Sequence, residues 1–309
     1  MIEILSGRKS KRAIVTLAIG EVYENNWKEF SLPSLTEYCR THNIGLYLQN
    51  ENLDTQCVKK KITWQKLLLA HEIRKKFSYI EEFCYIDSDV VVNKFAPSIF
   101  DFNDGTLAMV SQFKELPFDL NLVLRRIAFY RNRFISAQYP LDSALFMSIE
   151  DIYKFHNLTP QKDYGCAGFF MGNIFDHSLH MSEIFNSYDA NVSTITDGGD
   201  EPILNFEFQN RFQTKWLPYK FQALWIYEMA AYYPFLYESL SDSNLILKCI
   251  ESSLQNNIFL HFAGSWNESK MISYVQRIPS DKEASEDFDK YYRSPLTGKP
   301  VGRILPNKE

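Results

Sequence analysis

The N-terminal third of the chain alternates short apolar runs with amphipathic stretches. Residues 13–19 are almost uninterruptedly apolar and stop at Gly20. Such a run is typical of a strand that is buried on both faces. Farther on, Leu69, Ile73 and Phe77 recur at the four-residue spacing of one helix face. The pattern predicts strands at 13–19 and 44–48 and helices at 25–40, interrupted at Pro33, and at 63–77.

Strand and helix therefore follow each other in turn, which predicts an α/β fold with a mostly parallel sheet flanked by helices. Farther along, the pattern predicts an apolar helical stripe at 120–127, a core strand at 166–171, a helix at 203–212 and a last strand at 258–262. From about residue 280 the chain turns polar, with scattered Pro and Gly. We expect one domain over residues 1–280, and a C-terminal extension or linker over 281–309.

Composition and charge narrow the classes of partner. The 309 residues carry a net charge of −5, so no basic field is available to gather nucleic acid. The five cysteines are scattered without a C-x-x-C pair and are expected to be reduced thiols. The N-terminus lacks a signal-peptide pattern and no apolar run approaches about 18 residues, which predicts a cytoplasmic protein without a transmembrane segment.

The candidate chemistry begins at residues 85–92, Tyr-Ile-Asp-Ser-Asp-Val-Val-Val. Asp87 and Asp89 stand at the end of an apolar run that is expected to be a buried strand. In an extended segment alternate side chains share a face, so the two carboxylates are expected to point into one site. Carboxylate pairs suit Mg²⁺ or Mn²⁺, which bind phosphate substrates through few protein ligands. In parallel sheets, ligands bind beyond the carboxyl ends of the strands, where this pair is predicted.

In this setting, the chain resembles the metal-dependent glycosyltransferases of the GT-A fold, whose D-x-D motif holds a divalent ion against the diphosphate of a nucleotide sugar. Residues 261–266, His-Phe-Ala-Gly-Ser-Trp, look like the start of the H-F-x-G-x-x-K-P-W motif of family 8 of these enzymes. The resemblance implies that His261 is a third metal ligand. The chain departs from that motif at residues 267–269, where Asn-Glu-Ser replaces Lys-Pro-Trp and Lys270 follows three positions late.

Two further segments occur in the order that such enzymes show. Residues 165–173 are similar to a family strand whose small residues, here Gly168, let the backbone approach the donor sugar. Residues 197–205 look like the start of a family helix, with Asp200 or Glu201 facing the reacting sugar and Asn205 one turn in. Ordinary helix capping explains these acids equally well.

The resemblance implies a GT-A type domain, with a Rossmann-like, mixed and mostly parallel sheet. Its nucleotide-sugar half would be residues 1–110 and its acceptor half residues 111–280. It implies a hexosyltransferase-like enzyme that moves a sugar from a nucleotide-diphosphate sugar, UDP-sugar above all, to a hydroxyl of a glycan or other acceptor. The cofactor would be Mn²⁺ or Mg²⁺, and retention of configuration is favoured. Asp200 and Glu201 would be catalytic, Asp87, Asp89 and His261 would hold the metal, and the donor-binding residues would be Thr16, Ala18, Gly20, Lys66, Asp87, Ser88, Asp89, Gly168, Gly264 and Lys270.

Other interpretations stay open. A haloacid-dehalogenase-like phosphatase also carries a D-x-D at a strand end, and a non-catalytic nucleotide-sugar or carbohydrate module would need the same metal site. The arginines at 125, 126, 131 and 133 lie largely off their helical stripe, which favours a solvated face, with acceptor or peripheral membrane contact as the alternative. The aromatic run at 216–237 is either buried core or a stacking platform for an acceptor.

Overall fold

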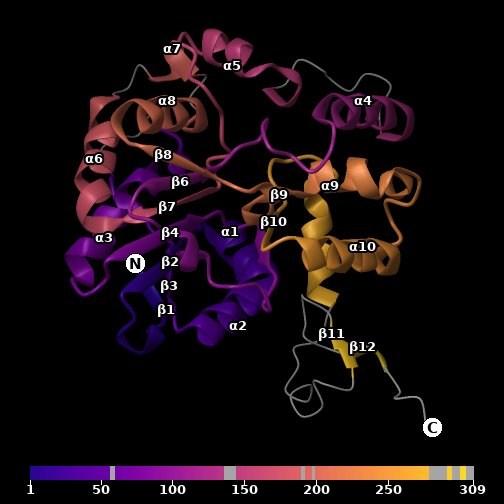
Figure 1. Cartoon of the computed structure of the whole chain (residues 1–309), viewed down its shortest axis with the longest axis horizontal. Helices are drawn as coiled ribbons and strands as arrows, with labels where there is room; N and C mark the ends of the chain where they lie inside the picture. Colours follow the sequence, from indigo (N-terminus) through magenta and orange to yellow (C-terminus); the bar gives the residue numbers. More distant parts are fainter. Residues whose placement is uncertain are drawn as a thin grey trace.

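The computed structural model describes residues 1–55, 60–135, 144–188, 192–196, 199–277, 291–293 and 300–303. Its main element is a seven-stranded sheet with the order β1-β3-β2-β4-β7-β6-β8 (Figure 1). The strands are β1 (Ile2–Leu5), β2 (Arg12–Leu17), β3 (Gly45–Gln49), β4 (Glu82–Ile86), β6 (Leu107–Val110), β7 (Phe169–Asn173) and β8 (Thr214–Leu217).

The pairing of neighbouring strands makes the sheet mixed but mostly parallel. β2 runs parallel to β3 and β4, and β6 runs parallel to β8. β7 lies antiparallel between β4 and β6, and β1 lies antiparallel to β3. Five strands therefore share one direction, and the predicted α/β fold class with flanking helices is confirmed.

Helices cover both faces of this sheet. α3 (Leu69–Lys76), α6 (Ile174–Ser187) and α8 (Glu201–Arg211) pack on the strand side chains of one face, and α2 (Leu32–His42) packs on those of the other. Neighbouring residues of one strand enter opposite cores, as Val15 and Ile14 of β2 do. A strand buried on both faces must be apolar at nearly every position, which explains the uninterrupted apolar runs of the sequence.

The predicted helices occur with different boundaries. The predicted helix at 25–40 is α1 (Glu21–Asn26), a π-helical segment at Trp27–Ser31, and α2, which has Pro33 in its first turn where no backbone donor is needed. The predicted helix at 63–77 is a 3₁₀ segment, η3 (Ile62–Leu68), followed by α3.

A second, three-stranded sheet has the order β5-β10-β9. It contains β5 (Val90–Val92), β9 (Ala223–Leu224) and β10 (Phe259–His261), with β10 antiparallel to β5 and parallel to β9. α9 (Trp225–Tyr232) and α10 (Ser243–Asn256) lie beside it, and α4 (Leu120–Tyr130) packs on α9. These three hydrogen-bonded strands form a second layer. It adjoins the large sheet where β5 follows the carboxyl end of β4.

The remaining α-helices and strands are short. They are α5 (Ile149–Phe155), α7 (Val192–Thr196) and, in the predicted C-terminal extension, the antiparallel pair β11 (Tyr291–Arg293) and β12 (Pro300–Arg303). The other residues of 281–309 lie outside the described residues, as do Asp197 and Gly198 of the predicted helix start. No helix in the described part of the chain has both the length and the apolar character that a membrane span requires.

Three sequence expectations concern residues that the structure shows to be buried. The four described cysteines, at 39, 84, 166 and 249, are free, in agreement with the expected reduced thiols, and all four are buried. The expectation of a solvated arginine face fails for Arg131, which is fully buried because Glu268 neutralises its charge. Much of the aromatic run belongs to the core, since Trp225, Tyr227 and Tyr237 are at most 1% exposed.

Candidate metal and donor site

The D-x-D segment is the turn that connects the two sheets. Asp87 follows β4 of the large sheet, and Asp89 precedes β5 of the small one. Because residues 87–89 form a turn, the expectation that the two carboxylates share the face of an extended strand is wrong. They nevertheless converge, since the turn redirects the chain and His261 arrives beside it at the end of β10. The Asp87 N–H donates to the Gly168 carbonyl at 2.9 Å, which holds the turn on β7.

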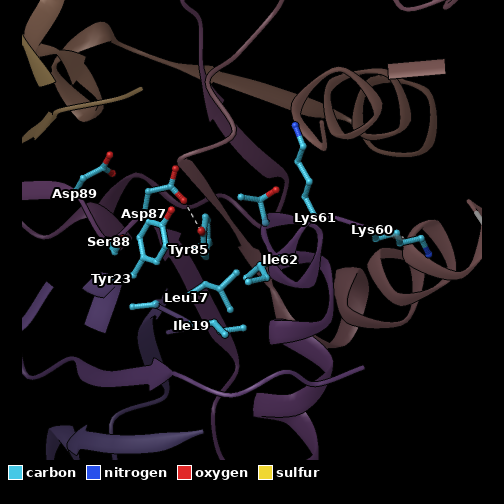
Figure 2. Close-up of a pocket in the computed structure, with 12 residues that line it drawn as sticks. Leu17, Ile19, Tyr23, Lys60, Lys61, Ile62, Tyr85, Asp87, Ser88 and Asp89 are labelled. Atoms are coloured by element: carbon cyan, nitrogen blue, oxygen red, sulfur yellow. Dashed lines mark hydrogen bonds between the residues drawn. The ribbon is translucent and has the colours of Figure 1, made fainter. Parts of the chain in front are cut away.

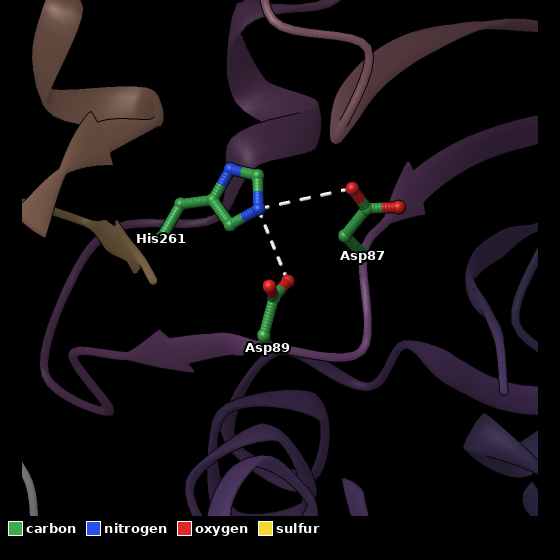
Figure 3. A group of neighbouring side chains, drawn as sticks. All are labelled: Asp87, Asp89 and His261. Atoms are coloured by element: carbon green, nitrogen blue, oxygen red, sulfur yellow. Dashed lines mark ion pairs between the residues drawn. The ribbon is translucent and has the colours of Figure 1, made fainter. Parts of the chain in front are cut away.

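Asp87, Asp89 and His261 form one group, called here the carboxylate–imidazole site (Figure 3). His261 Nε2 lies 3.0 Å from Asp89 Oδ1 and 3.7 Å from Asp87 Oδ2. The three ligand atoms all lie within 4.8 Å of one another. Burial opposes a proton on His261, but the nearby Asp89 carboxylate outweighs it and raises the pKa of the imidazole well above its usual value. The site thus attracts positive charge, and its oxygen and nitrogen ligands suit Mn²⁺ or Mg²⁺.

Gln222 fixes the orientation of the imidazole. Its amide oxygen accepts hydrogen bonds from His261 Nδ1 at 3.1 Å and from the Phe169 N–H at 3.2 Å, while its amide nitrogen donates to the Cys166 carbonyl at 3.3 Å. With Nδ1 engaged as a donor, Nε2 is the nitrogen presented to the carboxylates. Partners of this kind orient metal-binding histidines and set their tautomer.

Gly168 leaves the space in which the three ligands meet. A Cβ at this position would lie 2.3 Å from His261 Cε1, 2.7 Å from Asp87 Oδ2 and 2.9 Å from the side-chain amide of Gln222. Gly168 was predicted to let the backbone approach the donor sugar, and that role stays a prediction. The structure gives a steric reason for glycine here, because a larger residue would displace the imidazole, the carboxylate or the amide.

Lys66 lies behind the carboxylates rather than on the protein surface. The residue is 3% exposed, and Nζ lies 3.0 Å from Asp200 Oδ2 and 3.6 Å from Asp87 Oδ1. Burial alone would lower its pKa, but the charges of Asp200 and Asp87 hold that pKa well above the ordinary value. Burial would raise the pKa of Asp200, and Lys66 outweighs it and lowers that pKa. Both groups are therefore charged and tie η3 to the start of α8.

Glu201, the first residue of α8, faces the same region in a different electrostatic setting. Its Oε2 accepts a hydrogen bond from the Ala167 N–H at 2.9 Å, and its Oε1 accepts one from Gln112 Nε2 at 3.4 Å. Burial raises the pKa of this carboxyl. One turn into α8, Asn205 makes two 2.7 Å hydrogen bonds with the backbone of Gly165. It therefore fixes the segment that leads into β7.

A cavity of about 630 Å³ opens beside the carboxylates (Figure 2). It extends from Asp87, Ser88 and Asp89 to the carboxyl end of β2, where Ala18 lines it. The full lining is Leu17, Ala18, Ile19, Tyr23, Lys60, Lys61, Ile62, Thr63, Tyr85, Asp87, Ser88 and Asp89. Thr16 is fully buried behind this wall, and Gly20 adopts a φ of 100° at the start of α1, close to the Tyr23 ring.

Six predicted donor-binding residues are not among those that line the cavity. They are Thr16, Gly20, Lys66 and Gly168, placed above, and Gly264 and Lys270. Gly264, with a φ of 85°, packs against Trp266, and Lys270 is exposed in the 3₁₀ segment Ser269–Arg277. Between them, Glu268 is fully buried and binds Arg131 through distances of 2.7 and 3.2 Å. The residues that depart from the family motif therefore anchor this loop to the protein interior.

Sequence reasoning missed three residues of the site. Gln222 carried no signal, because it precedes a two-residue strand that no periodicity reveals. Tyr85 donates a hydrogen bond to Asp87 and lies under Lys66, with Nζ 5.1 Å from its ring centre. Tyr23 is 62% exposed yet lines the cavity. An exposed aromatic residue directly after the first strand could have been noticed.

Comparisons with known proteins give structural similarities only. No protein family matches the chain, and no curated protein does. Among solved structures, it is similar to a glycosyltransferase involved in the glycosylation of the major capsid of PBCV-1, at 13% identity and a TM-score of 0.44, over 85% of this chain and 98% of that one. The WbbM bifunctional glycosyltransferase is 14% identical with a TM-score of 0.47, over 82% of this chain and 46% of its own. Galactosyltransferase LgtC in complex with donor and acceptor sugar analogues is 12% identical with a TM-score of 0.44, over 88% and 98%.

Proposed function

We propose that this protein is a metal-dependent glycosyltransferase that moves a sugar from a nucleotide-diphosphate sugar to a hydroxyl of a glycan or other acceptor. The observation that carries the proposal is the carboxylate–imidazole site beside a cavity that ends at the carboxyl end of β2. In open α/β sheets that position receives nucleotides. A cation at the opposite end of the cavity would meet the diphosphate of the same molecule.

The cavity has the size and lining for such a donor. Its volume of about 630 Å³ lies within the usual range of roughly 300–1,000 Å³ for small-molecule sites. Tyr23 offers an aromatic face for the base, and the Leu17 to Ile19 segment offers apolar and backbone contacts to the base and ribose. Lys61 adds a cation to the wall. We infer a UDP-sugar as the donor and Mn²⁺ as the preferred ion, because an imidazole joins the two carboxylates.

The charges of the site explain why a metal ion is needed. Asp87 and Asp89 are partly exposed to the cavity, so a diphosphate would meet two negative charges there. A bound divalent ion would act as a Lewis acid that neutralises charge on the leaving diphosphate. Lys66 adds a buried positive charge beside Asp87 and stabilises the orientation of that carboxylate.

The two predicted catalytic acids divide their roles on this geometry. Asp200 is committed to Lys66 and stays ionised, so we assign it to positioning α8. Glu201 has a raised pKa and one hydrogen bond from the Ala167 backbone, so its carboxyl group is the better candidate to face the reacting sugar or the attacking hydroxyl. We propose retention of configuration.

A panel of nucleotide sugars with Mn²⁺ tests the proposal. We expect one donor to raise the melting temperature and to be hydrolysed slowly, releasing nucleoside diphosphate, and we expect chelation to abolish both effects. Asp89→Asn should lose them, whereas Asp101→Asn, on the surface, should keep them. Release of phosphate from simple phosphomonoesters, with no response to any nucleotide sugar, would replace this function with a phosphatase. Donor binding without turnover in the presence of varied acceptors would indicate a binding module.

A further inference from the structure

The outward face of α4 and of the π-helical segment that continues it, Arg131–Ile135, carries apolar and basic side chains. Leu122 is 48% exposed and Phe129 is 59% exposed. Arg125 and Arg133 are exposed as well. A solvated helix face usually mixes charges of both signs, and large apolar side chains on it are scattered. These four side chains are called here the α4 stripe.

The spacing of the α4 stripe places its members on one side of the helix. Intervals of three and four residues separate Leu122, Arg125, Phe129 and Arg133, and residues at such intervals are neighbours on a helix surface. The opposite side is the one that packs into the core, where Val123 and Ile127 are at most 1% exposed. The apolar residues of the α4 stripe are therefore additional to those that hold the helix in place.

The charge of this segment opposes that of the whole chain. Residues 120–135 contain four arginines and no acidic residue, although the chain has a net charge of −5. Two of the arginines serve the fold: Arg126 donates to the carbonyls of Ala230 and Ala231 at 3.3 and 3.0 Å, and Arg131 binds Glu268. Arg125 and Arg133 form no ion pair within the described residues, so their charges are available to a partner.

We propose that the α4 stripe binds the surface of an anionic lipid bilayer. Leucine and phenylalanine side chains would enter the boundary between headgroups and acyl chains, while the two guanidinium groups contact lipid phosphates. A stable protein interface buries roughly 800 Å² on each partner. A single row of four side chains on one helix is a narrow ridge, and a fluid bilayer can accommodate such a ridge without a complementary surface.

The same helix is connected to the metal site. Arg131 joins α4 to Glu268 in the loop that follows His261, and the Trp266 ring lies 4.6 Å from the Arg131 guanidinium. Membrane contact through the α4 stripe would therefore hold this loop and the end of β10 close to the bilayer. If the proposed glycosyltransferase function holds, this arrangement suits an acceptor hydroxyl carried by a lipid. The lipid contact itself does not depend on that function.

Vesicle co-sedimentation of the full chain, without metal or nucleotide sugar, tests the lipid contact. We expect binding to vesicles of phosphatidylcholine with phosphatidylglycerol, weaker binding to phosphatidylcholine alone, and a decrease in binding as salt rises. The double variants Arg125→Glu/Arg133→Glu and Leu122→Ser/Phe129→Ser should each bind at least about tenfold more weakly.

The matched control is Phe155→Ser/Leu179→Ser, which removes a phenylalanine and a leucine that are 61% and 48% exposed on α5 and α6. This variant should bind vesicles like the wild type. Circular dichroism and Mn²⁺ affinity check that every variant stays folded. Absent vesicle binding by the wild type, or equal binding by the α4 variants, would overturn the proposal. Self-association of the wild type that the α4 variants abolish, without vesicle binding, would assign the surface to a second copy of the chain.

Discussion

Two groups of charged side chains lie near the end of β10, and they differ in how their charges are balanced. At the carboxylate–imidazole site, the Asp87 and Asp89 side chains are 29% and 37% exposed and share one imidazole. Glu268, in the loop beyond it, pairs with Arg131 of the segment that continues α4. Both are fully buried and neutralise each other, and the Tyr237 hydroxyl donates a further hydrogen bond to Glu268 at 3.0 Å. The carboxylate–imidazole site faces a cavity, whereas the Arg131–Glu268 pair is shut off from solvent.

The difference separates a binding role from a structural one. A fully buried ion pair whose charges cancel is out of reach of a ligand. Two carboxylates that face solvent across one imidazole keep unsatisfied capacity for a cation. Glu268 stands in the segment that departs from the H-F-x-G-x-x-K-P-W pattern, and its ion pair with Arg131 anchors the loop beyond His261 to the protein interior.

Substitution in the buried Arg131–Glu268 pair should have the largest effect on stability. Glu268→Ala leaves the Arg131 charge buried without its partner, so the free energy of unfolding is expected to fall by about 3–5 kcal/mol. Urea denaturation followed by circular dichroism measures it. Replacing both members, as Arg131→Met/Glu268→Leu, should recover part of the loss. A loss below about 1 kcal/mol for Glu268→Ala would show that the pair adds little.

Substitution in the carboxylate–imidazole site should change activity rather than stability. Asp89→Asn keeps the size of the side chain but removes its charge, and turnover of the metal-dependent donor reaction is expected to fall about 100–1,000-fold. The free energy of unfolding should stay within about 1 kcal/mol of the wild type, because the residue is partly exposed. Full turnover in the folded variant would remove Asp89 from the metal site.

Gln222 tests whether the imidazole is held in place for a metal. Gln222→Leu removes the acceptor for His261 Nδ1, and Mn²⁺ affinity is expected to fall about 10–100-fold. Gln222→Glu keeps an acceptor oxygen and should retain more of the affinity. Electron paramagnetic resonance of free Mn²⁺ measures both constants. Equal losses in the two variants would indicate a packing role for this side chain.

The buried carboxyl group of Glu228 gives the smallest expected effect. It accepts hydrogen bonds from the Ser253 hydroxyl and the Asn257 amide, and burial raises its pKa above 4.5. The folded state therefore holds the Glu228 proton more tightly than the unfolded state. Its contribution to stability is complete below pH 4.5 and is lost as the pH rises through the raised value.

Glu228→Gln should remove this dependence on pH. We expect the variant to gain about 1 kcal/mol relative to the wild type between pH 4.5 and neutral pH. Denaturation midpoints measured across that range give the difference. A wild-type protein that becomes more stable than the variant as the pH rises would contradict the sign.

Much of the fold could be predicted because its strands are buried on both faces. The runs at 13–19 and 44–48 correspond to β2 and β3, and Asp87 and Asp89 lie at the expected edge. The antiparallel insertion of β7 between β4 and β6 could not be foreseen, since pairing direction leaves no mark on a buried apolar run. The second sheet was missed as a layer because its strands are two or three residues long.

Within the site, residue type indicated which side chains would meet but not their geometry. His261 and the aspartates were predicted as a group and do converge, whereas Lys66, predicted as a donor-binding residue, lies behind them. The turn at 87–89 was mistaken for extended strand, because a D-x-D between apolar residues fits both conformations. Gln222 and the Arg131–Glu268 pair depend on contacts between segments far apart in sequence, and such contacts leave no local pattern.

The turn at Asp87–Asp89 also has a mechanical consequence. Asp87 follows a strand of the large sheet, whereas Asp89 directly precedes β5 of the small sheet and His261 ends its strand β10. A cation bound to all three would cross-link the two layers, so separating them would require breaking metal–ligand bonds. Amide hydrogen exchange in β5 and β10 should therefore slow as the ion concentration rises, because ion binding stabilises the folded state by mass action. The ion would then act as a reversible cross-link between the two sheets.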